Sequence, residues 1–349
     1  MLSFKQFLTE GGAGGHVLHP FDIANTGQEL IDLFVEAINY IKTGKAGEPG
    51  SSWVKLDGIN MSVKIVDGEF RLDRGSSKEL DIRGMRPDDF ENRGLKPGFI
   101  ENARILFAML DKSYDSTKKE LSDLGVTDSR IDEKDKVITQ TIINLEFVGE
   151  NQTNVIKYKI PKFIAIHGLR KSTYDTTTNK RTIIDIPTPS ADILERYVNS
   201  LNKVTEKFNF LTIGNPSVKE KKKINIDGIL SKNITLNNKN QSLRKWLEEI
   251  KEIPKKNGRA IIFKKAEFKN ILSGDNQNLT DNEVRDFILY KATIDLGDVL
   301  LKSLTSDLGD LHDQEGLMVK RKNGQIFKIT GNFILRGPEE TKFGANTNG

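Results

Sequence analysis

A lysine and an arginine at the ends of predicted strands have the types and spacing of residues that could take part in catalysis. Lys55 opens the motif Lys-x-Asp-Gly with Asp57 and Gly58, and an alternating apolar run after it predicts a β-strand. The Asp-Gly pair at 67–68 predicts a two-residue hairpin turn, and the return strand leads to Arg74. This pattern places Lys55 and Arg74 at neighbouring ends of two paired strands, as a potential nucleophile and a potential phosphate-binding group.

Three further short signals occur later in the chain, each centred on a charged residue of a predicted strand. Alone, each signal is weak, and an Asp-Gly pair at 227–228 that lacks the lysine shows how easily such a dipeptide recurs. Together, the five signals follow a fixed order at predicted strand ends, which is far more specific. The later signals are Glu146-Phe147-Val148-Gly149, Glu315-Gly316-Leu317-Met318-Val319-Lys320 and Phe327-Lys328-Ile329.

Periodicity and turn signals predict a mixture of helices and strands around these motifs. The highly charged stretch 111–135 predicts a loop with a helical piece. Ser190 is a predicted helix cap, and Thr280 with Glu283 forms a predicted capping box. Helices are predicted over 28–42, 98–110 and 190–208, near Trp246 and after Thr280; strands are predicted over 54–66, 70–73, 137–148, 155–158, 163–167, 316–320 and 325–329.

The composition of the chain excludes several classes of function. Its 349 residues contain no cysteine, which excludes disulfides, thiolate catalysis and cysteine-ligated zinc, and its four histidines show no metal-ligand spacing. No apolar run approaches the length of a membrane span, and no secretory signal is present, so a globular cytoplasmic protein is expected.

The net charge of +4 is unevenly distributed. Residues 219–269 contain 15 Lys and Arg against 6 Asp and Glu, a local charge of +9 that leaves −5 for the remainder. Such a basic segment in an otherwise acidic chain is typical of a surface that binds a phosphate backbone. A solvated lysine-rich face is the alternative.

The ordered motifs resemble those of the covalent nucleotidyltransferases, the ATP-dependent polynucleotide ligases and their capping-enzyme relatives. The phage RNA ligases are the branch that the chain resembles most. The resemblance covers about residues 50–170 and 310–332. It implies an α+β fold of two antiparallel sheets flanking a nucleotide cleft, the ligase adenylyltransferase fold.

The resemblance implies a role for each motif residue. Lys55 would attack the α-phosphate of ATP and form a lysyl-AMP intermediate, which requires the amine to be neutral. Asp57 and Gly58 would lie beside the nucleotide, where Gly58 allows a tight turn. Arg74 would bind phosphate, and Glu146 would accept hydrogen bonds from the ribose hydroxyls.

The later motifs complete this expected site. Glu315 would hold Mg²⁺, or Mn²⁺, because hard cations prefer carboxylate oxygens. Lys320 and Lys328 would neutralise the triphosphate and lower the pKa of the nucleophilic amine. Where the resembled ligases carry an aromatic residue that stacks on adenine, this chain has Ile166 with His167 beside it, so the base would be held by an aliphatic contact with Ile166 or stacked on His167. The last motif of many relatives has two lysines, but Thr330 stands in the second place.

Several plain alternatives stay open for these residues. Lys55 and Lys328 could be ordinary exposed strand lysines, and Arg74 could form a surface ion pair with Asp73 or Glu79. Trp246, in the basic segment, could stack on a base, but such a tryptophan more often lies in a core.

The expected domain organisation follows from the motif positions. Residues 16–170 and 306–337 would form the nucleotidyltransferase core, and 171–305 a mainly helical basic insertion that contacts polynucleotide. Residues 1–15 would form a mobile N-terminal arm and 338–349 a disordered tail. With 19 residues after Thr330, a C-terminal OB domain is not expected.

The function expected from the resemblance is ATP-dependent joining of 5′-phosphate to 3′-hydroxyl ends, with RNA favoured. The expected partner is RNA or a nicked or single-stranded nucleic acid. The alternatives are a nucleic-acid-binding or virion-internal phage protein without sealing activity, and an adenylyltransferase with another acceptor. Leu8-Thr9-Glu10 before Gly11 resembles a phage prohead protease site. The expected location is therefore the infected bacterial cytoplasm, with packaging in the phage head if the arm is cleaved; a short docked helix is the alternative.

Overall fold

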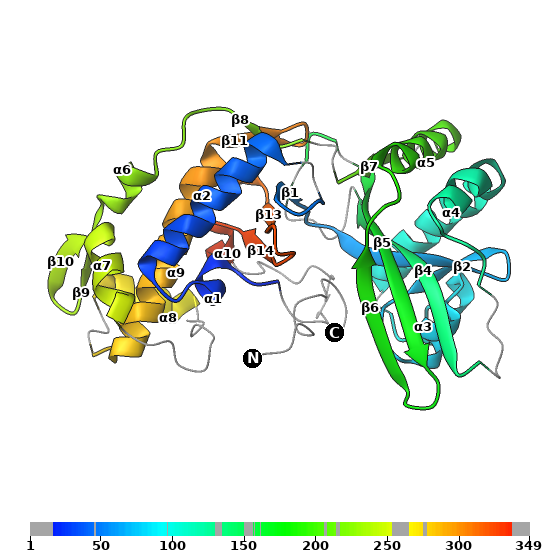
Figure 1. Cartoon of the computed structure of the whole chain (residues 1–349), viewed down its shortest axis with the longest axis horizontal. Helices are drawn as coiled ribbons and strands as arrows, with labels where there is room; N and C mark the ends of the chain where they lie inside the picture. Colours follow the sequence, from blue (N-terminus) through cyan, green and yellow to red (C-terminus); the bar gives the residue numbers. More distant parts are fainter. Residues whose placement is uncertain are drawn as a thin grey trace, which may run out of the picture. The chain divides into compact units, whose positions relative to one another are not determined.

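The computed structural model describes residues 17–44, 47–95, 97–129, 135–149, 156, 158–160, 162–205, 208–213, 217–252, 265–274 and 278–336. The expected N-terminal arm, the Glu10-Gly11 site and the expected tail lie outside these residues. The described chain divides into two compact units (Figure 1). We call residues 57–213 the sheet unit and residues 17–56 with 217–336 the helical unit.

The sheet unit is built on a six-stranded sheet of order β3-β2-β4-β5-β6, with β7 parallel to β5 and the other pairs antiparallel. Asp67 and Gly68 have positive φ values of 53° and 76°, so the predicted two-residue turn between β2 and β3 is confirmed. The strands are β2 (Ile59–Val66), β3 (Glu69–Asp73), β4 (Val137–Val148), β5 (Phe163–Asp175), β6 (Lys180–Ile186) and β7 (Asn209–Thr212).

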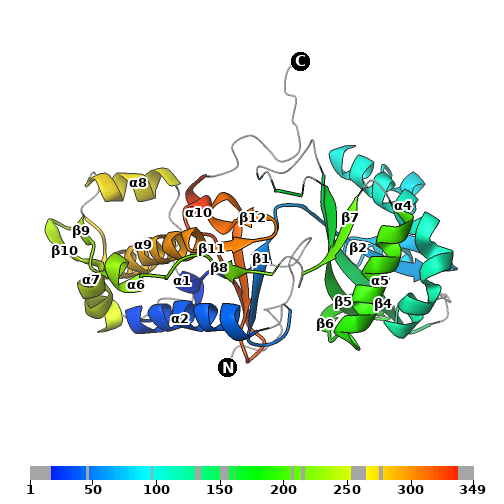
Figure 2. The same cartoon turned by 90° about the horizontal axis from the view of Figure 1, so that it is seen from above.

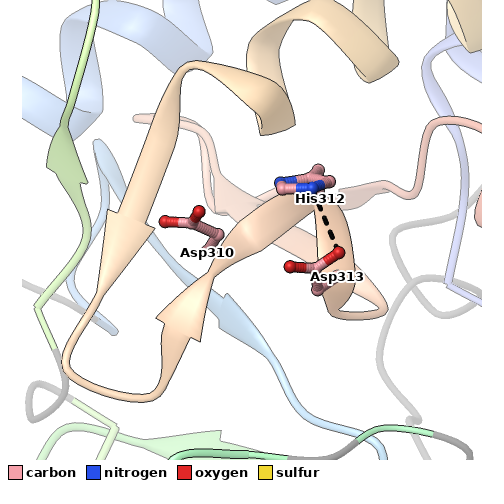
Figure 3. Close-up of side chains that lie close together, drawn as sticks. All are labelled: Asp310, His312 and Asp313. Carbon is pink, nitrogen blue, oxygen red and sulfur yellow. Dashed lines mark ion pairs between the residues drawn. The ribbon is translucent and has the colours of Figure 1, made fainter.

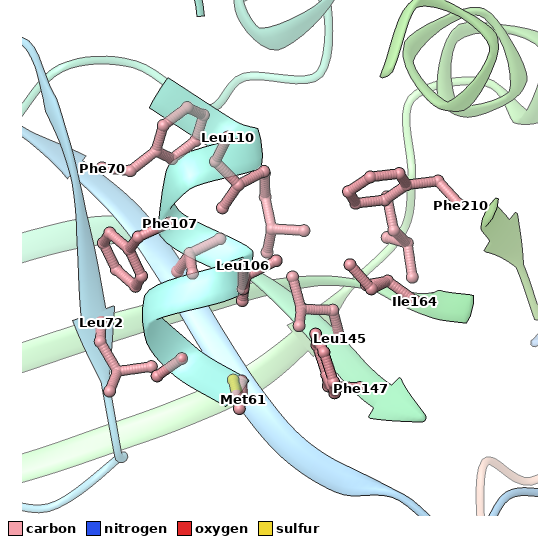
Figure 4. Packing of buried hydrophobic residues seen from close by; sticks show 14 of the residues in the cluster. Met61, Phe70, Leu72, Leu106, Phe107, Leu110, Leu145, Phe147, Ile164 and Phe210 are labelled. Atoms are coloured by element: carbon pink, nitrogen blue, oxygen red, sulfur yellow. The ribbon is translucent and has the colours of Figure 1, made fainter. Parts of the chain in front are cut away.

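One face of this sheet is apolar and packs on two helices, α4 (Pro97–Asp123) and α5 (Ala191–Val204) (Figure 2). Alternation along β2 places Met61, Val63 and Ile65 in this core, as predicted. The helices α3 (Glu79–Arg83) and η2 (Pro87–Asp89) connect β3 to α4. Figure 4 shows the packing of Met61, Phe70, Leu72, Leu106, Phe107, Leu110, Leu145, Phe147, Ile164 and Phe210.

Helix α4 continues to Asp123, so the prediction that it ends at Leu110 was wrong. Ser113, Thr117 and Leu121 are buried at four-residue spacing and continue the packed side of the helix. The charged residues that suggested a loop lie on its exposed side, where, for example, Lys119 pairs with Asp123.

The helical unit is organised around α9 (Asp281–Lys302), which is buried on most sides and packs on α1, α2, α6 and α7. The capping box of Thr280 and Glu283 that starts α9 is confirmed. The remaining helices are α1 (Pro20–Ile23), α2 (Gly27–Thr43), α6 (Ile226–Leu230), α7 (Leu243–Glu249), η3 (Ile250–Glu252), α8 (Lys265–Ser273), η5 (Leu311–Asp313) and α10 (Phe333–Arg336).

Three small antiparallel sheets complete the helical unit. The first, which carries Lys55, has the order β1-β13-β14. The other two have the orders β12-β11-β8 and β10-β9. The strands are β1 (Ser51–Lys55), β8 (Lys219–Glu220), β9 (Asn233–Leu236), β10 (Lys239–Ser242), β11 (Leu304–Ser306), β12 (Gly309–Asp310), β13 (Gly316–Lys320) and β14 (Ile326–Ile329).

The chain is therefore an α+β protein with antiparallel sheets, but its units do not divide at residues 170 and 305. Strand β5 continues to Asp175 because its second half pairs with both β4 and β6, so the expected insertion begins inside a strand. The units divide at residues 56–57 and 216–217. Among the described residues, no helix is long and apolar enough to cross a membrane.

Candidate functional site

The predicted site residues fall into two sets, one in each unit. Lys55, Glu315, Lys320 and Lys328 belong to the helical unit, and the remaining predicted residues belong to the sheet unit. Strand β1 ends at Lys55 and pairs with β13, whereas the hairpin of β2 and β3 belongs to the six-stranded sheet. The prediction that Lys55 and Arg74 end two paired strands was therefore wrong, because the chain changes sheets between Lys55 and Ile59.

Lys55 lies against the carboxylate of Glu315. The Nζ atom of Lys55 is 3.3 Å from Oε1 of Glu315, and the two side chains are 17% and 15% exposed. The pairing of β1 with β13 sets Lys55 opposite Gly316, so Glu315 precedes the residue that faces the lysine. A largely enclosed amine and carboxylate thus lie within ion-pair distance at a strand end.

Gly316 is required by the close approach of β14. Its φ is +143°, and a Cβ atom there would lie 2.1 Å from the carbonyl oxygen of Ile329. Only glycine fits such an approach without moving the backbone. The backbone geometry of Gly316 therefore helps to place the preceding residue, Glu315, beside Lys55.

The register also fixes the other basic residues of this sheet. Lys320 pairs with Ser51, four residues along β1 from Lys55, a separation of roughly 13 Å at 3.3 Å per residue. Its Nζ atom donates to the carbonyl oxygen of Gly47 at 3.2 Å. Lys328 pairs with Met318 on the third strand. Lys320 lies at the far end of the strand pair from Lys55, and β14, which carries Lys328, pairs with β13 and not with β1. The lowering of the Lys55 pKa by these cations stays a prediction.

Thr330 is the residue in line with Lys55 across the sheet. Leu317 pairs with Ile329, so the next position, Thr330, lies beyond Gly316 from Lys55. Thr330 is buried. The position that the sequence analysis compared with a second lysine of the last motif is thus occupied by a neutral, enclosed side chain.

In the sheet unit, Gly58, Glu146 and His167 form a hydrogen-bonded group. The backbone N–H of Gly58 donates to Oε1 of Glu146 at 2.8 Å, and Nε2 of His167 lies 2.9 Å from Oε2 of Glu146. A Cβ atom on Gly58 would lie 2.7 Å from Cγ of Glu146, so the approach requires glycine. Asp57 is buried, and its N–H donates to the Tyr158 hydroxyl at 2.7 Å.

A β-bulge decides between Ile166 and His167. Asn144 pairs with Gly168, but the next residue of β4, Leu145, pairs with Ile166, so His167 is the extra residue. Ile166 is buried in the apolar core and cannot contact a base. The bulge leaves His167 beside Glu146, and the expectation that Ile166 holds the base was wrong.

Arg74 is a half-buried cation. Its Nη1 atom donates to the carbonyl oxygen of Asn60 at 2.6 Å, and its guanidinium lies 4.6 Å from the centre of the Phe99 ring. Burial lowers the pKa of Arg74, while the charge of Asp81 partly opposes this. Within the described chain, no carboxylate lies within ion-pair distance of this guanidinium.

The alternative ion pairs proposed for Arg74 do not form. Asp73 pairs with Lys64 and Arg181, and Glu79 pairs with Arg83. Arg74 therefore forms no ion pair with a carboxylate of the described protein, although the charges of Asp81 and Asp73 act on it, and such a group suits an anionic ligand.

The pair formed by Lys64 and Asp73 was missed by the sequence analysis. Lys64 lies on the polar face of β2 and is fully buried, with its Nζ atom 2.9 Å from Asp73. Burial would raise the pKa of Asp73, but the charges of Lys64 and Arg181 outweigh it and hold the pKa below its ordinary value. Alternating polar positions on β2, β4 and β5, such as Lys64, were a signal that this face is not simply exposed.

A second group missed from the sequence is the cluster of Asp310, His312 and Asp313 (Figure 3). One ligand atom from each residue lies within 4.8 Å of the others, and Nε2 of His312 is 3.0 Å from Oδ1 of Asp313. Lys221 donates to Asp310 at 2.7 Å and already compensates that carboxylate. The cluster is partly exposed and does not by itself define a metal site.

The basic segment is more paired than its charge suggests. Lys239 pairs with Glu249 and Arg244 with Asp227, while the Lys222 and Lys223 side chains are exposed. Trp246 is buried, and its Nε1 atom donates to the carbonyl oxygen of Ile234 at 3.2 Å. Trp246 is therefore a core residue and does not stack on a base.

No protein-family model matches this chain, and no curated protein matches it.

Proposed function

We propose that this chain is a covalent nucleotidyltransferase of the polynucleotide-ligase type, with Lys55 as the nucleophile. The ligase adenylyltransferase fold is part of the same proposal. The observation that carries it is the pair of Lys55 and Glu315, 3.3 Å apart and largely enclosed at the end of β1. An ordinary strand lysine would extend into solvent, whereas enclosing an amine is costly unless the group has a partner or a task.

The proposed reaction transfers AMP in two displacements. The neutral amine of Lys55 attacks the α-phosphorus of ATP, a P–N bond forms, and pyrophosphate leaves with the electron pair of the broken P–O bond. The AMP then passes to the 5′-phosphate of a polynucleotide, and Lys55 is released. In the sealing step a 3′-hydroxyl attacks that 5′-phosphate and AMP leaves.

The sheet unit supplies groups suited to nucleotide binding. Glu146 offers carboxylate oxygens to ribose hydroxyls, and His167 offers a flat ring in place of the expected aromatic residue. Arg74 carries a positive charge that no described carboxylate neutralises, and its planar guanidinium suits phosphate oxygens.

Glu315 fits a magnesium ligand, because Mg²⁺ is usually bound by one or two carboxylates together with substrate phosphates. When bound, the ion would neutralise charge that develops on the departing pyrophosphate. The protein's own contribution is to hold the Glu315 carboxylate at the strand end beside Lys55.

RNA is the favoured acceptor, and the exposed lysines of the basic segment, including Lys222 and Lys223, would contact its phosphates. Such contacts are salt-sensitive and largely independent of sequence. The preference for RNA comes from the resemblance of the motifs and is tested separately below.

The test is covalent labelling. Protein is incubated with α-labelled ATP or GTP and Mg²⁺, denatured, and assayed for retained label. Wild-type protein and Lys171→Ala, which changes an exposed lysine of β5, are expected to retain label from ATP. Lys55→Ala is expected to retain none. Absence of label with either nucleotide would overturn the proposal, and label retained by Lys55→Ala would overturn the assignment of the nucleophile.

The acceptor is tested by adding 5′-phosphorylated RNA or DNA to labelled protein. Transfer to RNA but not to DNA is the expected result. Transfer to DNA alone would contradict the proposed substrate class.

A protein that binds nucleic acid without sealing it is the second candidate, and Thr330 favours it. A neutral, buried residue lies in line with Lys55 where many relatives have a lysine. This candidate predicts that RNA binds and that no label is retained, so the same assay separates the two.

A further inference from the structure

The segment that carries Arg74 is fixed by charged residues from two other strands of the sheet unit, β2 beside β3 and β6 at the far end of the sheet order. It runs from Asp73 at the end of β3 to Ile82 in α3. Arg181 of β6 and Lys64 of β2 bind both its side chains and its backbone. Neither residue has a role in the chemistry proposed above, and Arg181 lies in the region that the sequence predicted to be a helical insertion.

Arg181 uses all of its guanidinium nitrogens inside the protein. Its side chain is 2% exposed; Nη1 donates to Asp73 at 2.9 Å, and Nη2 binds the other oxygen of the same carboxylate. Nη1 also donates to the carbonyl oxygen of Ser76 at 2.7 Å, and Nε donates to the Ser172 hydroxyl at 2.8 Å. Arg181 thus binds the residue before Arg74 and the second residue after it.

Lys64 anchors the rest of the segment. Its Nζ atom donates to the carbonyl oxygens of Asp81 and Ile82 at 2.8 and 2.6 Å, in addition to its ion pair with Asp73. The carboxylate of Asp81 in turn accepts a hydrogen bond from the Ser76 hydroxyl. The backbone on both sides of Arg74 is therefore tied to buried side chains.

The charges of this group do not cancel. Four basic side chains, Lys64, Arg74, Arg93 and Arg181, accompany two carboxylates, Asp73 and Asp81, so basic groups are in excess even though burial lowers the pKa of Lys64. Asp73 is bound by Lys64 and Arg181, and Asp81 by Arg93. Arg74 is the cation of the group that these ion pairs leave for an anion, and a largely buried charge excess favours one strongly.

We propose that Arg181 is a positioning residue, which holds residues 73–76 so that the Arg74 guanidinium is fixed for the phosphate of a bound nucleotide. This inference rests on the proposed function for the identity of the ligand. The bidentate contact to Asp73 and the contact to the Ser76 carbonyl fix the backbone on either side of Arg74, so the guanidinium loses little freedom on binding.

Hydrogen exchange tests the positioning without any activity. Arg181→Gln is expected to raise amide exchange across residues 74–82. Arg86→Gln breaks another Arg–Asp pair of the same unit, with Asp111, and is expected to leave that segment unchanged. Unchanged exchange in Arg181→Gln would overturn the inference. Should Arg181→Gln fail to fold, Arg181→Lys keeps the charge, loses the two parallel hydrogen bonds and serves in its place.

A double-mutant cycle tests whether Arg181 acts through Arg74. The rate of lysyl-AMP formation at subsaturating ATP is measured for wild type, Arg181→Gln, Arg74→Ala and the double variant. Arg181→Gln is expected to lower this rate about tenfold or more, as misplacing a binding group does. In the Arg74→Ala background the same change is expected to cost less than about twofold, because the two positions are coupled.

Equal losses in both backgrounds would show a merely structural role for Arg181 and overturn the inference. If wild-type protein forms no lysyl-AMP, the proposed function fails instead. In that case, amide exchange across residues 74–82 is the measurement that tests whether Arg181 positions the segment.

Discussion

The chemistry proposed for Lys55 depends on a neighbour that has no side chain. Gly316 faces Lys55 across β1 and β13, and its φ of +143° brings β14 close enough that a Cβ atom would lie 2.1 Å from the Ile329 oxygen. The carboxylate that accompanies Lys55 is carried by the residue before this glycine. The Glu-Gly dipeptide is thus one structural requirement, in which the glycine sets the backbone and the glutamate supplies the charge.

Gly316→Ala is expected to lower the free energy of unfolding by about 2–4 kcal/mol, because both the φ angle and the clash with backbone must be accommodated. Gly324→Ala is the matched control. It also has a positive φ, +85°, but nothing lies within 4 Å of its Cβ position. Urea denaturation measures the free energy of unfolding of both variants. An equal loss in the two would show that the close approach of β14 adds no penalty for a Cβ atom at position 316.

At the residue scale, the sequence singled out Gly58 and Glu146 separately, and only the structure shows the hydrogen bond between them. The sequence also left open the choice between Ile166 and His167. Strand alternation alone would put only one of two adjacent residues on the polar face. The extra residue at the Asn144/Leu145 irregularity sets that choice, and a bulge leaves no signal in the hydrophobic pattern.

At the scale of elements, the hairpin of β2 and β3 is tied to β6 by a buried charge group. Lys64 of β2 and Arg181 of β6 both pair with Asp73 at the end of β3. Removing one partner of such a group leaves the others as uncompensated buried charges.

Asp73→Asn is expected to lower the free energy of unfolding at pH 7 by about 3–5 kcal/mol. Because the folded-state pKa of Asp73 lies below its ordinary value of 3.8, its contribution to stability is present above pH 3.8 and is lost as the pH falls through the folded-state pKa. The variant should therefore lose less stability than the wild type on acidification. Urea denaturation at a series of pH values measures this.

Asp111→Asn breaks the more exposed pair with Arg86 and is the matched control, with an expected cost of about 1 kcal/mol or less. A wild-type acid dependence retained in Asp73→Asn would contradict the charged state assigned to Asp73.

The sequence predicted most elements correctly, because their apolar spacing and caps are local. It ended α4 at Leu110 because the next stretch is charged, although Ser113 and Thr117 are small enough to pack where apolar residues were sought. Long-range pairing is also invisible locally, so neither the second half of β5 nor its partner β6 was predicted.

At the scale of the whole molecule, the sequence showed where the basic residues gather along the chain, but not which of them form ion pairs. The segment 219–269 was correctly identified as basic. Some of its ion pairs lie within the segment, such as Lys239 with Glu249, but others, such as Lys221 with Asp310, join residues far apart in the chain and depend on the fold. The division of the chain at residues 56–57 and 216–217 has the same origin, because distant segments assemble one unit.

Replacing both Lys222 and Lys223 by alanine is expected to weaken RNA binding and to reduce the slope of log affinity against log salt concentration by about 1.4, roughly 0.7 for each lost phosphate contact. Lys239→Ala, which changes a lysine paired with Glu249, should leave the slope nearly unchanged. Filter binding over a series of salt concentrations measures both. An unchanged slope in the double variant would place the polynucleotide elsewhere on the protein.

The central claim, that Lys55 forms a bond to the nucleotide, is tested most directly by mass spectrometry of peptides after incubation with ATP and Mg²⁺. The account predicts an AMP adduct on the peptide that contains Lys55 and none on the corresponding peptide of Lys55→Ala. An adduct on another lysine, or unmodified Lys55 in wild-type protein that has bound ATP, would contradict it.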